Sequence, residues 1–270
     1  MKATTRVSAR WEGRLIEQAP PFAPAPPSDA TDATDASDAS GVALTTAPPR
    51  ALALVARAPA YLAWRRDRGS VYFALKRALD LSVAALALIV SAPLLLVIAA
   101  LIWLEDGGPV IYSRQVIGQQ GRMFTMFKFR TMCQRAEDLL QQDEALLAEY
   151  KRQHFKLRRD PRVTRLGRIL RKYSLDELPQ FVNILLGQMS LIGPRAVPPA
   201  EIEQFGETAT MRAWVKPGLS GLWQVSGRSD TTYAERIRLD CEYVERCSLS
   251  LDLRILLRTL PAVARGVGAY

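Results

Sequence analysis

The longest apolar run in the chain extends from Leu81 to Leu104, where 24 consecutive residues carry no charged side chain. At a rise of about 1.5 Å per residue, a helix of this length can cross a hydrocarbon core of about 30 Å. Pro93 lies near the midpoint, where proline removes a helical hydrogen bond and clashes with the carbonyl group four residues earlier. Each half of the run, at about 18 Å, is too short to span a membrane alone.

Basic residues flank this run on both sides. They are Arg65, Arg66, Arg68, Lys76 and Arg77 before it, and Arg114, Arg122, Lys128 and Arg130 after it. Positive residues at both ends are expected when both ends stay in the cytoplasm. The pattern therefore favours a re-entrant helix over 76–108 that enters one leaflet, breaks at Ser91 and Pro93 and returns, with a plain transmembrane helix as the alternative. The Ser91 hydroxyl could satisfy a backbone group freed at the break.

The pattern after this segment predicts two short strands and then mostly helices. Residues 109–131 form two β-prone runs around a turn at 118–121. Helical periodicity follows at 134–156, 164–173, from Pro179 to Leu186, 233–246 and 251–266, and the glycine-rich residues 216–228 are expected to form a loop and a short strand. The fold class expected is mainly α with a small β element (α+β), with a re-entrant membrane helix, interfacial amphipathic helices and a small cytosolic catalytic domain.

The first fifty residues differ from the rest in composition. They are rich in Ala, Pro, Thr, Ser and Asp, and they repeat the pattern Ser/Thr-Asp-Ala over 28–39. Such a segment buries too little apolar surface to offset its ordering entropy, so 1–50 is expected to be a disordered tail. The expected organisation is then a juxtamembrane segment at 51–75, whose apolar part either lies on the membrane or packs on the domain, the re-entrant segment at 76–108 and a catalytic domain at 109–270.

The net charge of +9 indicates a negatively charged partner, which can be nucleic acid, anionic lipid or a phosphorylated substrate. No nucleic-acid-binding signature is present, and nucleic-acid binding leaves the uncharged run unexplained, so no nucleic-acid partner is expected. The three cysteines form no CxxC pair, and the single histidine, His154, provides no zinc cluster. These residues favour a reduced, cytosolic setting.

A basic helix leads directly into two adjacent carboxylates. Arg165, Arg168 and Arg171 recur at helical spacing, an arrangement that suits bidentate contact with phosphates, although a solvated or headgroup-contacting face is the alternative. Asp176 and Glu177 follow within six residues. Ser174-x-x-Glu177 is also a capping box, which needs no functional role. The functional alternative is that one carboxylate attacks phosphorus while the other holds Mg²⁺, and both interpretations can hold together.

Five stretches together resemble the bacterial monotopic phosphoglycosyl transferases, the polyisoprenyl-phosphate hexose-1-phosphate transferases that start exopolysaccharide and other surface-glycan assembly. The resemblance extends from about Lys76 to Tyr270. The stretches are 76–80 (KRALD) continuing through Pro93, 128–132 (KFRTM), 174–180 (SLDELPQ), 189–195 (MSLIGPR) and 217–225 (PGLSGLWQV). Each is moderately specific alone, and their order makes the combination strongly specific.

The resemblance implies a two-step reaction. Asp176 would attack the sugar-bearing phosphorus of a UDP-sugar with release of UMP, and the phosphosugar would then pass from the aspartate to polyprenyl (undecaprenyl) phosphate. Glu177 would hold Mg²⁺, and Arg171, Arg195 and Arg228 would hold phosphate or uridine. The chain departs from the family at the membrane break, where Ala92-Pro93 replaces the usual Ser-Pro and Ser91 is displaced by one residue.

The resemblance also implies a place and partners for the chain. Its site would be the bacterial inner membrane, with the catalytic domain facing the cytoplasm and in contact with membrane lipids; a homodimer stays open. Asp252 and the closing Gly268-Ala269-Tyr270 resemble the branch that uses glucose or galactose. An N-acetylated sugar, or a non-enzymatic basic membrane scaffold, is the alternative.

Overall fold

The computed structural model describes residues 59–152, 157, 160–202, 205–206, 208–227 and 231–265. All of these belong to one compact unit. The expected tail at 1–50, Arg228 and His154 lie outside the described residues, as does the closing 268–270.

The described elements are mostly helices with two small sheets, so the α+β expectation is confirmed at that level. Strands β1 and β2 pair antiparallel around the predicted turn, whereas β3 and β4 form a parallel pair that the sequence pattern did not predict. In chain order the elements are α2 (Pro59–Asp106), β1 (Ile111–Ile117), η2 (Gln119–Gly121), β2 (Met123–Phe129), α3 (Ala136–Gln142), α4 (Glu144–Arg152), α5 (Arg165–Lys172), η3 (Leu175–Glu177), α6 (Gln180–Leu185), β3 (Ser190–Ile192), α7 (Pro199–Ile202), α8 (Thr208–Arg212), β4 (Gly218–Ser220), α9 (Leu222–Val225), α10 (Tyr233–Arg246) and α11 (Leu249–Arg265).

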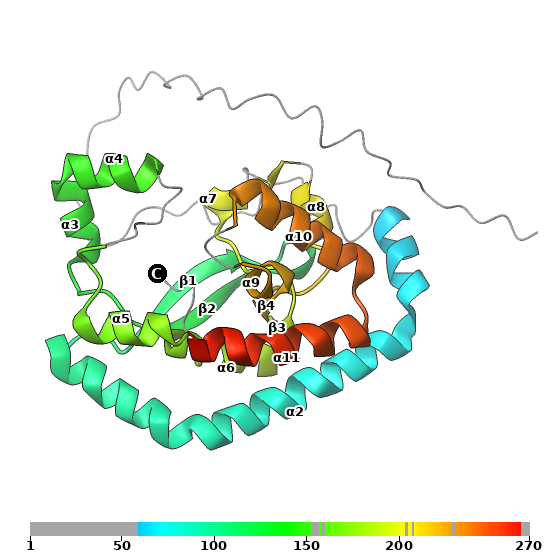
Figure 1. The fold of residues 1–270 in the computed structure, drawn as a ribbon, viewed down its shortest axis with the longest axis horizontal. Helices are drawn as coiled ribbons and strands as arrows, with labels where there is room; N and C mark the ends of the chain where they lie inside the picture. Colours follow the sequence, from blue (N-terminus) through cyan, green and yellow to red (C-terminus); the bar gives the residue numbers. More distant parts are fainter. Residues whose placement is uncertain are drawn as a thin grey trace, which may run out of the picture. The chain divides into compact units, whose positions relative to one another are not determined.

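Helix α2 contains the whole apolar run and passes beneath the other elements in the view of Figure 1. Its arm before the run is tied to the domain by Asp80, whose Oδ1 accepts hydrogen bonds from Ser190 Oγ (3.0 Å) and from the Leu191 backbone N–H (2.9 Å). Its far end is tied to the same domain, because Asp106 pairs with Arg130. Polar groups at both ends of the apolar run therefore bind one folded unit.

The expected interruption of the helix at Ser91 and Pro93 is wrong. Helical geometry continues through Pro93, and α2 follows a curved path beneath the other elements in Figure 1. The Ser91 hydroxyl donates to the Ala87 carbonyl oxygen (2.6 Å), whereas the carbonyl that Pro93 deprives of a donor belongs to Ile89. A proline removes one hydrogen bond, which bends a helix that is held at both ends without ending it.

The start of α2, which is the described part of the juxtamembrane segment, packs on the domain. Tyr61 and Trp64 are buried and stack on each other, and both rings also contact Trp214. The Trp64 indole N–H donates to the Val244 carbonyl oxygen (2.9 Å). The described part of the juxtamembrane segment therefore belongs to the core, and a kink at Gly69 (φ 70°, ψ 157°) separates its first turns from the rest of α2.

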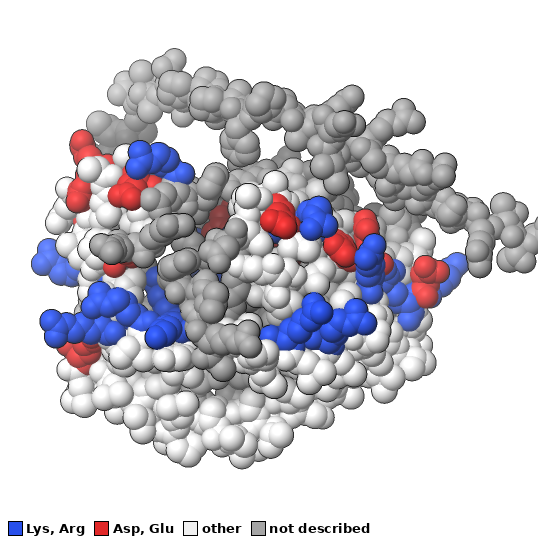
Figure 2. Space-filling model, in the orientation of Figure 1, with Lys and Arg blue, Asp and Glu red and all other residues white. Residues whose placement is uncertain are grey.

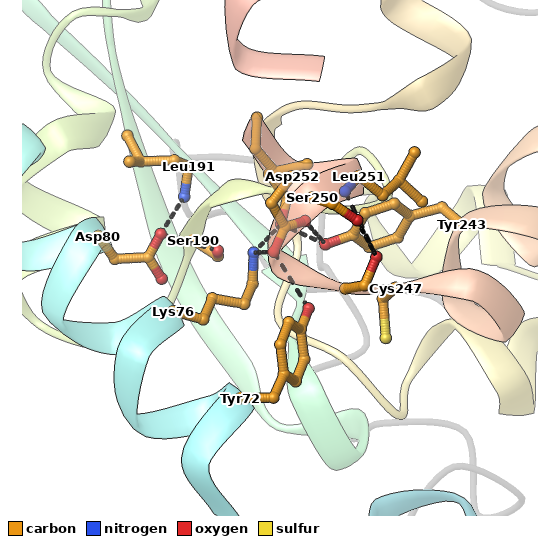
Figure 3. Close-up of polar contacts among 12 residues, drawn as sticks. Tyr72, Lys76, Asp80, Ser190, Leu191, Tyr243, Cys247, Ser250, Leu251 and Asp252 are labelled. Atoms are coloured by element: carbon orange, nitrogen blue, oxygen red, sulfur yellow. Dashed lines mark hydrogen bonds and ion pairs between the residues drawn. The ribbon is translucent and has the colours of Figure 1, made fainter. Parts of the chain in front are cut away.

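A buried polar network fastens the next turns of α2 to the C-terminal helices (Figure 3). Asp252 of α11 is 1% exposed, and its carboxylate accepts from Lys76 Nζ (3.0 Å), Tyr72 Oη (3.1 Å) and Tyr243 Oη (2.7 Å). The Lys76 ammonium also donates to the Ile192 carbonyl oxygen (3.0 Å). Because each of these groups is paired, the network can stay buried without an uncompensated charge.

The helix expected at 134–156 is wrong as a single element. It is divided at Asp143, which has extended backbone angles (φ −113°, ψ 96°) between α3 and α4. The Asp143 carboxylate accepts a hydrogen bond from the Leu146 backbone N–H (2.9 Å), so it caps the start of α4. An aspartate inside a leucine-rich pattern provided the signal for this boundary.

Exposed apolar side chains gather on α2 and on the outer faces of three further helices. They are Leu86, Ile89, Val90, Leu94, Leu96, Val97, Leu101, Trp103 and Leu104 on α2, Ile169 on α5, Val182 and Leu185 on α6, and Leu253, Leu257 and Leu260 on α11. In Figure 2 the lower surface is uncharged, and lysines and arginines border it along α5 and α11. Within the described residues α2 alone is long and apolar enough to cross a membrane.

Gly167 sets how closely α5 approaches the segment after β2. A Cβ atom at this position would overlap the backbone carbonyl oxygen of Thr131. We expect Gly167→Ala to lower the thermal unfolding midpoint in detergent by several degrees, because a backbone clash costs about 1–3 kcal/mol and exceeds the gain in helix propensity of about 1 kcal/mol. Arg168→Ala, at the exposed neighbouring position, is the control; a Gly167→Ala variant more stable than the unchanged chain would contradict the close approach.

Candidate active site

The two adjacent carboxylates lie in η3, a single turn of 3₁₀-helix between α5 and α6. Ser174, directly before it, has a left-handed backbone (φ 55°, ψ 25°), and its side chain makes no capping hydrogen bond. The capping-box interpretation is therefore wrong, since Ser174 turns the chain and does not cap a helix. Leu175 packs beside Ile98, Ile102 and Phe129, so the turn lies directly against the second half of α2.

Glu177 is held by two cations. Its Oε1 accepts from Lys128 Nζ (2.8 Å) and from Arg195 Nη2 (3.2 Å), and its side chain is 16% exposed. Burial alone would raise the pKa of this carboxyl group, but Lys128 and Arg195 outweigh it and lower the pKa to about 2. Glu177 is therefore ionised at every physiological pH.

Asp176 behaves in the opposite way. Its side chain is buried, and among the described residues no hydrogen bond or ion pair is found for its carboxyl group. Burial raises the pKa of Asp176 and the negative charge of Glu177 adds to this rise, while Lys128, Arg171 and Arg195 oppose it. The dyad thus combines one carboxylate fixed by cations with a neighbour whose oxygens stay available.

The predicted arginine stripe divides into two parts. Arg171 turns toward the site, where its Nε donates to Thr131 Oγ1 (2.9 Å) and its charge acts on Asp176, and burial lowers the pKa of the guanidinium group. Arg165 and Arg168 are exposed on the outer face of α5. One arginine of the stripe therefore belongs to the site, and the other two belong to the surface.

Arg195 reaches the dyad from the loop that follows β3. Its backbone forms a parallel bridge with Gly218, and its carbonyl oxygen accepts from Arg212 Nη2 (2.6 Å). The side chain is 37% exposed while it contacts Glu177, so its outer face is open to a ligand. Arg228, the third predicted arginine, lies outside the described residues.

Three further residues near the site had no role assigned from the sequence. Lys128, at the end of β2, is within a recognised motif and contributes the shortest contact to Glu177. Asn183 fixes α6 to β2, because its Nδ2 donates to the Thr125 carbonyl oxygen (2.7 Å) and its Oδ1 accepts from the Phe127 N–H (3.0 Å). The Arg236 guanidinium lies over the Trp223 ring (4.3 Å), and burial together with the charge of Arg195 lowers the pKa of Arg236. Of these three, only Lys128 had a sequence signal, as the single charged residue of its strand.

The donor set of the dyad fits Mg²⁺. No group of three or more histidine, cysteine, aspartate and glutamate side chains is found in the described part of the chain. Mg²⁺ prefers hard oxygen ligands, and protein sites commonly supply one or two carboxylates and leave the rest to substrate phosphates and water. The second oxygen of Glu177 is a ligand of that kind, and it leaves the Asp176 carboxyl group free for another role.

Residues 71–266 match the family model described as bacterial sugar transferase. The chain belongs to this family. The matched residues begin in α2 and end just after α11, so the sugar-transferase region includes the apolar run of α2, the dyad and the C-terminal helices.

Curated relatives agree with this assignment. The exopolysaccharide production protein ExoY of Rhizobium meliloti is 44% identical over 198 residues, which are 72% of this chain and 88% of that protein. The undecaprenyl-phosphate galactose phosphotransferase of Salmonella typhimurium is 41% identical over 203 residues, which are 73% of this chain and 42% of that protein. An N-acetylgalactosaminephosphotransferase of Aeromonas hydrophila is 38% identical over 205 residues, which are 74% of this chain and 46% of that protein.

The family resemblance drawn from the motifs is thereby confirmed, and the sugar transferase is an enzyme of the phosphoglycosyl transferase class. A non-enzymatic scaffold does not agree with this membership. The chain spans less than half the length of the Salmonella and Aeromonas relatives.

Proposed function

We propose that this sugar transferase moves hexose-1-phosphate from a UDP-sugar to polyprenyl phosphate, with release of UMP, as the first step of exopolysaccharide or surface-glycan synthesis. The observation that carries the proposal is the Asp176 carboxyl group, which is buried beside three cations in a turn whose Leu175 packs against α2. A phosphoryl donor from the cytoplasm and a lipid phosphate from the membrane can both reach such a position.

The proposed chemistry has two displacements at one phosphorus atom. An oxygen of Asp176 attacks the sugar-bearing phosphorus, the bond from that phosphorus to the bridging oxygen breaks, and UMP leaves with the bridging oxygen. An oxygen of polyprenyl phosphate then attacks the same phosphorus, and the aspartate oxygen leaves. The products are a polyprenyl diphosphate sugar and the free carboxylate, so the aspartyl phosphosugar divides one difficult displacement into two easier ones.

The charged neighbours have distinct proposed roles. Glu177 would hold Mg²⁺, and a bound Mg²⁺ would supply electrostatic stabilisation of the diphosphate oxygens. Arg195 and Arg171 bind phosphate oxygens, and their guanidinium groups suit bidentate contact. Arg228 is proposed to contact phosphate or uridine on the strength of the family motif alone.

We propose glucose or galactose as the sugar. Relatives are named for galactose in Salmonella typhimurium and Erwinia amylovora and for glucose in Komagataeibacter xylinus. The Aeromonas relative is named for an N-acetylated sugar, which keeps that substrate as the alternative. UMP release measured with a panel of UDP-sugars distinguishes the two.

We further propose that the enzyme resides in the bacterial inner membrane with both ends of α2 on the cytoplasmic side. Asp80 and Asp106 bind the same folded unit, and a straight helix across the bilayer would carry one of them to the other side. The uncharged lower surface and its cationic border support the same placement, since anionic lipids attract such borders (Figure 2).

The topology predicts the accessibility of two engineered cysteines. Single cysteines at Arg66 and Arg114, both exposed, are introduced after replacement of Cys133, Cys241 and Cys247. Both should be shielded from an impermeant periplasmic thiol reagent and should react after the cells are permeabilised. Labelling of only one in intact cells would establish a spanning helix. Pro93→Leu should straighten α2 and increase the labelled fraction at one of the two positions.

The proposed reaction is tested by incubating membranes that contain the enzyme with UDP-glucose or UDP-galactose, polyprenyl phosphate and Mg²⁺. UMP and a lipid-linked sugar should form together. EDTA should abolish turnover, and Mg²⁺ should restore it, because the dyad offers hard oxygen ligands. Restoration by zinc alone would refute the metal assignment, and absence of UMP with every UDP-sugar would refute the reaction.

A further inference from the structure

A second cationic site lies where α10 meets α11. A groove of about 310 Å³ opens there, and its lining includes none of the residues around Asp176. Its polar lining residues are Glu242, Arg246, Ser248, Ser250, Arg254 and Arg258. The volume is at the lower end of the range for small-molecule pockets.

The charges of this groove are not balanced by the protein. Glu242 is already neutralised, because its two oxygens pair with Arg246 (3.0 Å) and Arg238 (3.3 Å). For Arg254 and Arg258 no hydrogen bond or ion pair is found within the described ranges. The groove therefore presents two uncompensated guanidinium groups, and an anion is the ligand that complements them.

The start of α11 adds neutral donors on the same side. Ser250, Arg254 and Arg258 are spaced four residues apart, so they lie along one face of the helix. Ser250 Oγ is 3.2 Å from Ser248 Oγ, and the latter also accepts from the Leu251 N–H (3.3 Å). Two arginines and hydroxyl groups along one helix face match a phosphate group with several oxygens.

The adjoining exposed face of α11 is apolar. Leu253, Leu257 and Leu260 are exposed there, and at about 100° per residue they lie beside the arginine face. In Figure 2 the cationic side chains over α11 border the uncharged lower surface directly. A phosphate attached to acyl chains can contact the arginine face and the apolar face together, whereas a free phosphate can contact only the arginine face.

We propose that this groove binds the phosphate of an anionic phospholipid of the phosphatidylglycerol class. The proposal relies on the membrane placement of α2 and is independent of the transfer chemistry. The opposite side of α11 carries Asp252, which holds Lys76 of α2. A lipid bound in the groove would therefore fasten α11, and through it the first arm of α2, at the headgroup level.

The test measures binding to the full chain in detergent. Dihexanoyl phosphatidylglycerol, dihexanoyl phosphatidylcholine and inorganic phosphate are titrated separately by calorimetry. The variant is Arg254→Gln/Arg258→Gln, and the matched control is Arg135→Gln/Arg152→Gln, which removes the same charge from exposed positions directly before α3 and at the end of α4. The unchanged chain should bind phosphatidylglycerol at least tenfold more tightly than the other two ligands. The variant should lose this preference, and the control should keep it.

A photoactivatable phosphatidylglycerol gives an independent measurement on the unchanged chain in membranes. Cross-links should map to peptides within 246–258. Equal affinity for inorganic phosphate would identify a free-anion site and overturn the lipid assignment. Unchanged lipid preference in the Arg254/Arg258 variant, or cross-links confined to other elements, would show that the groove is not the lipid-binding site. None of these results depends on UMP release, so the proposal can fail while the transferase reaction stands.

Discussion

Asp176→Asn should abolish transfer, with UMP release reduced on the order of a thousandfold or more, as is typical when a nucleophile is removed. Asparagine keeps the size of the side chain but cannot displace UMP to form an acyl phosphate. The loss should affect both half reactions, since each involves the same oxygen. Asp138→Asn, at an exposed position of α3, is the matched control and should retain full activity.

The covalent step itself is visible by mass spectrometry. When the unchanged enzyme is quenched after incubation with UDP-sugar and Mg²⁺ alone, a hexose-phosphate adduct should map to the peptide that contains Asp176. UMP release should then not require the lipid, and initial-rate plots should be parallel. Intersecting plots without an adduct would replace the covalent scheme with direct attack by the lipid phosphate in a ternary complex.

The sequence pattern predicted those parts of the fold that depend on local periodicity. The β1–β2 hairpin, α5, α6 and α10 lie close to their expected ranges, because hydrophobic spacing acts over a few residues. The division at Asp143 and the unbroken α2 at Pro93 were missed. In both cases a single residue, Asp143 or Pro93, is compatible with either a continuous or an interrupted helix, and the sequence pattern did not indicate which one forms.

Long-range pairings could not be predicted from the sequence pattern. Strands β3 and β4 are three residues each and pair across 28 positions, from Ser190 to Gly218, which leaves no local periodicity to detect. In the same way, the motif around Lys128 was recognised, but its contact with Glu177 spans 49 positions. Asp176, Glu177, Arg171 and Arg195 were named from motifs, yet the opposite environments of the two carboxyl groups follow only from the cations that folding brings beside them.

Lys128 is the residue that most directly links the two carboxyl groups, since its charge lowers the pKa of both. We expect Lys128→Met to reduce kcat/KM at neutral pH on the order of a hundredfold. Loss of one preorganised group that stabilises charge in an active site typically has an effect of that size. The direction of the expected change with pH follows from the ionisation of Asp176. Asp176 attacks only when ionised, so the rate falls as the pH decreases through its pKa, and removal of the nearby cation raises that pKa further.

The acidic limb of the kcat/KM profile should therefore move to higher pH in the Lys128→Met enzyme, and activity should recover in part under alkaline conditions. Lys128→Arg retains the charge and should keep the limb close to that of the unchanged enzyme. Arg195 still pairs with Glu177 when Lys128 is removed, so the fold should be retained. Circular dichroism of each variant checks this. An acidic limb that stays in place while the rate falls equally at every pH would mean that Lys128 acts on the bound substrate and not on the ionisation of Asp176.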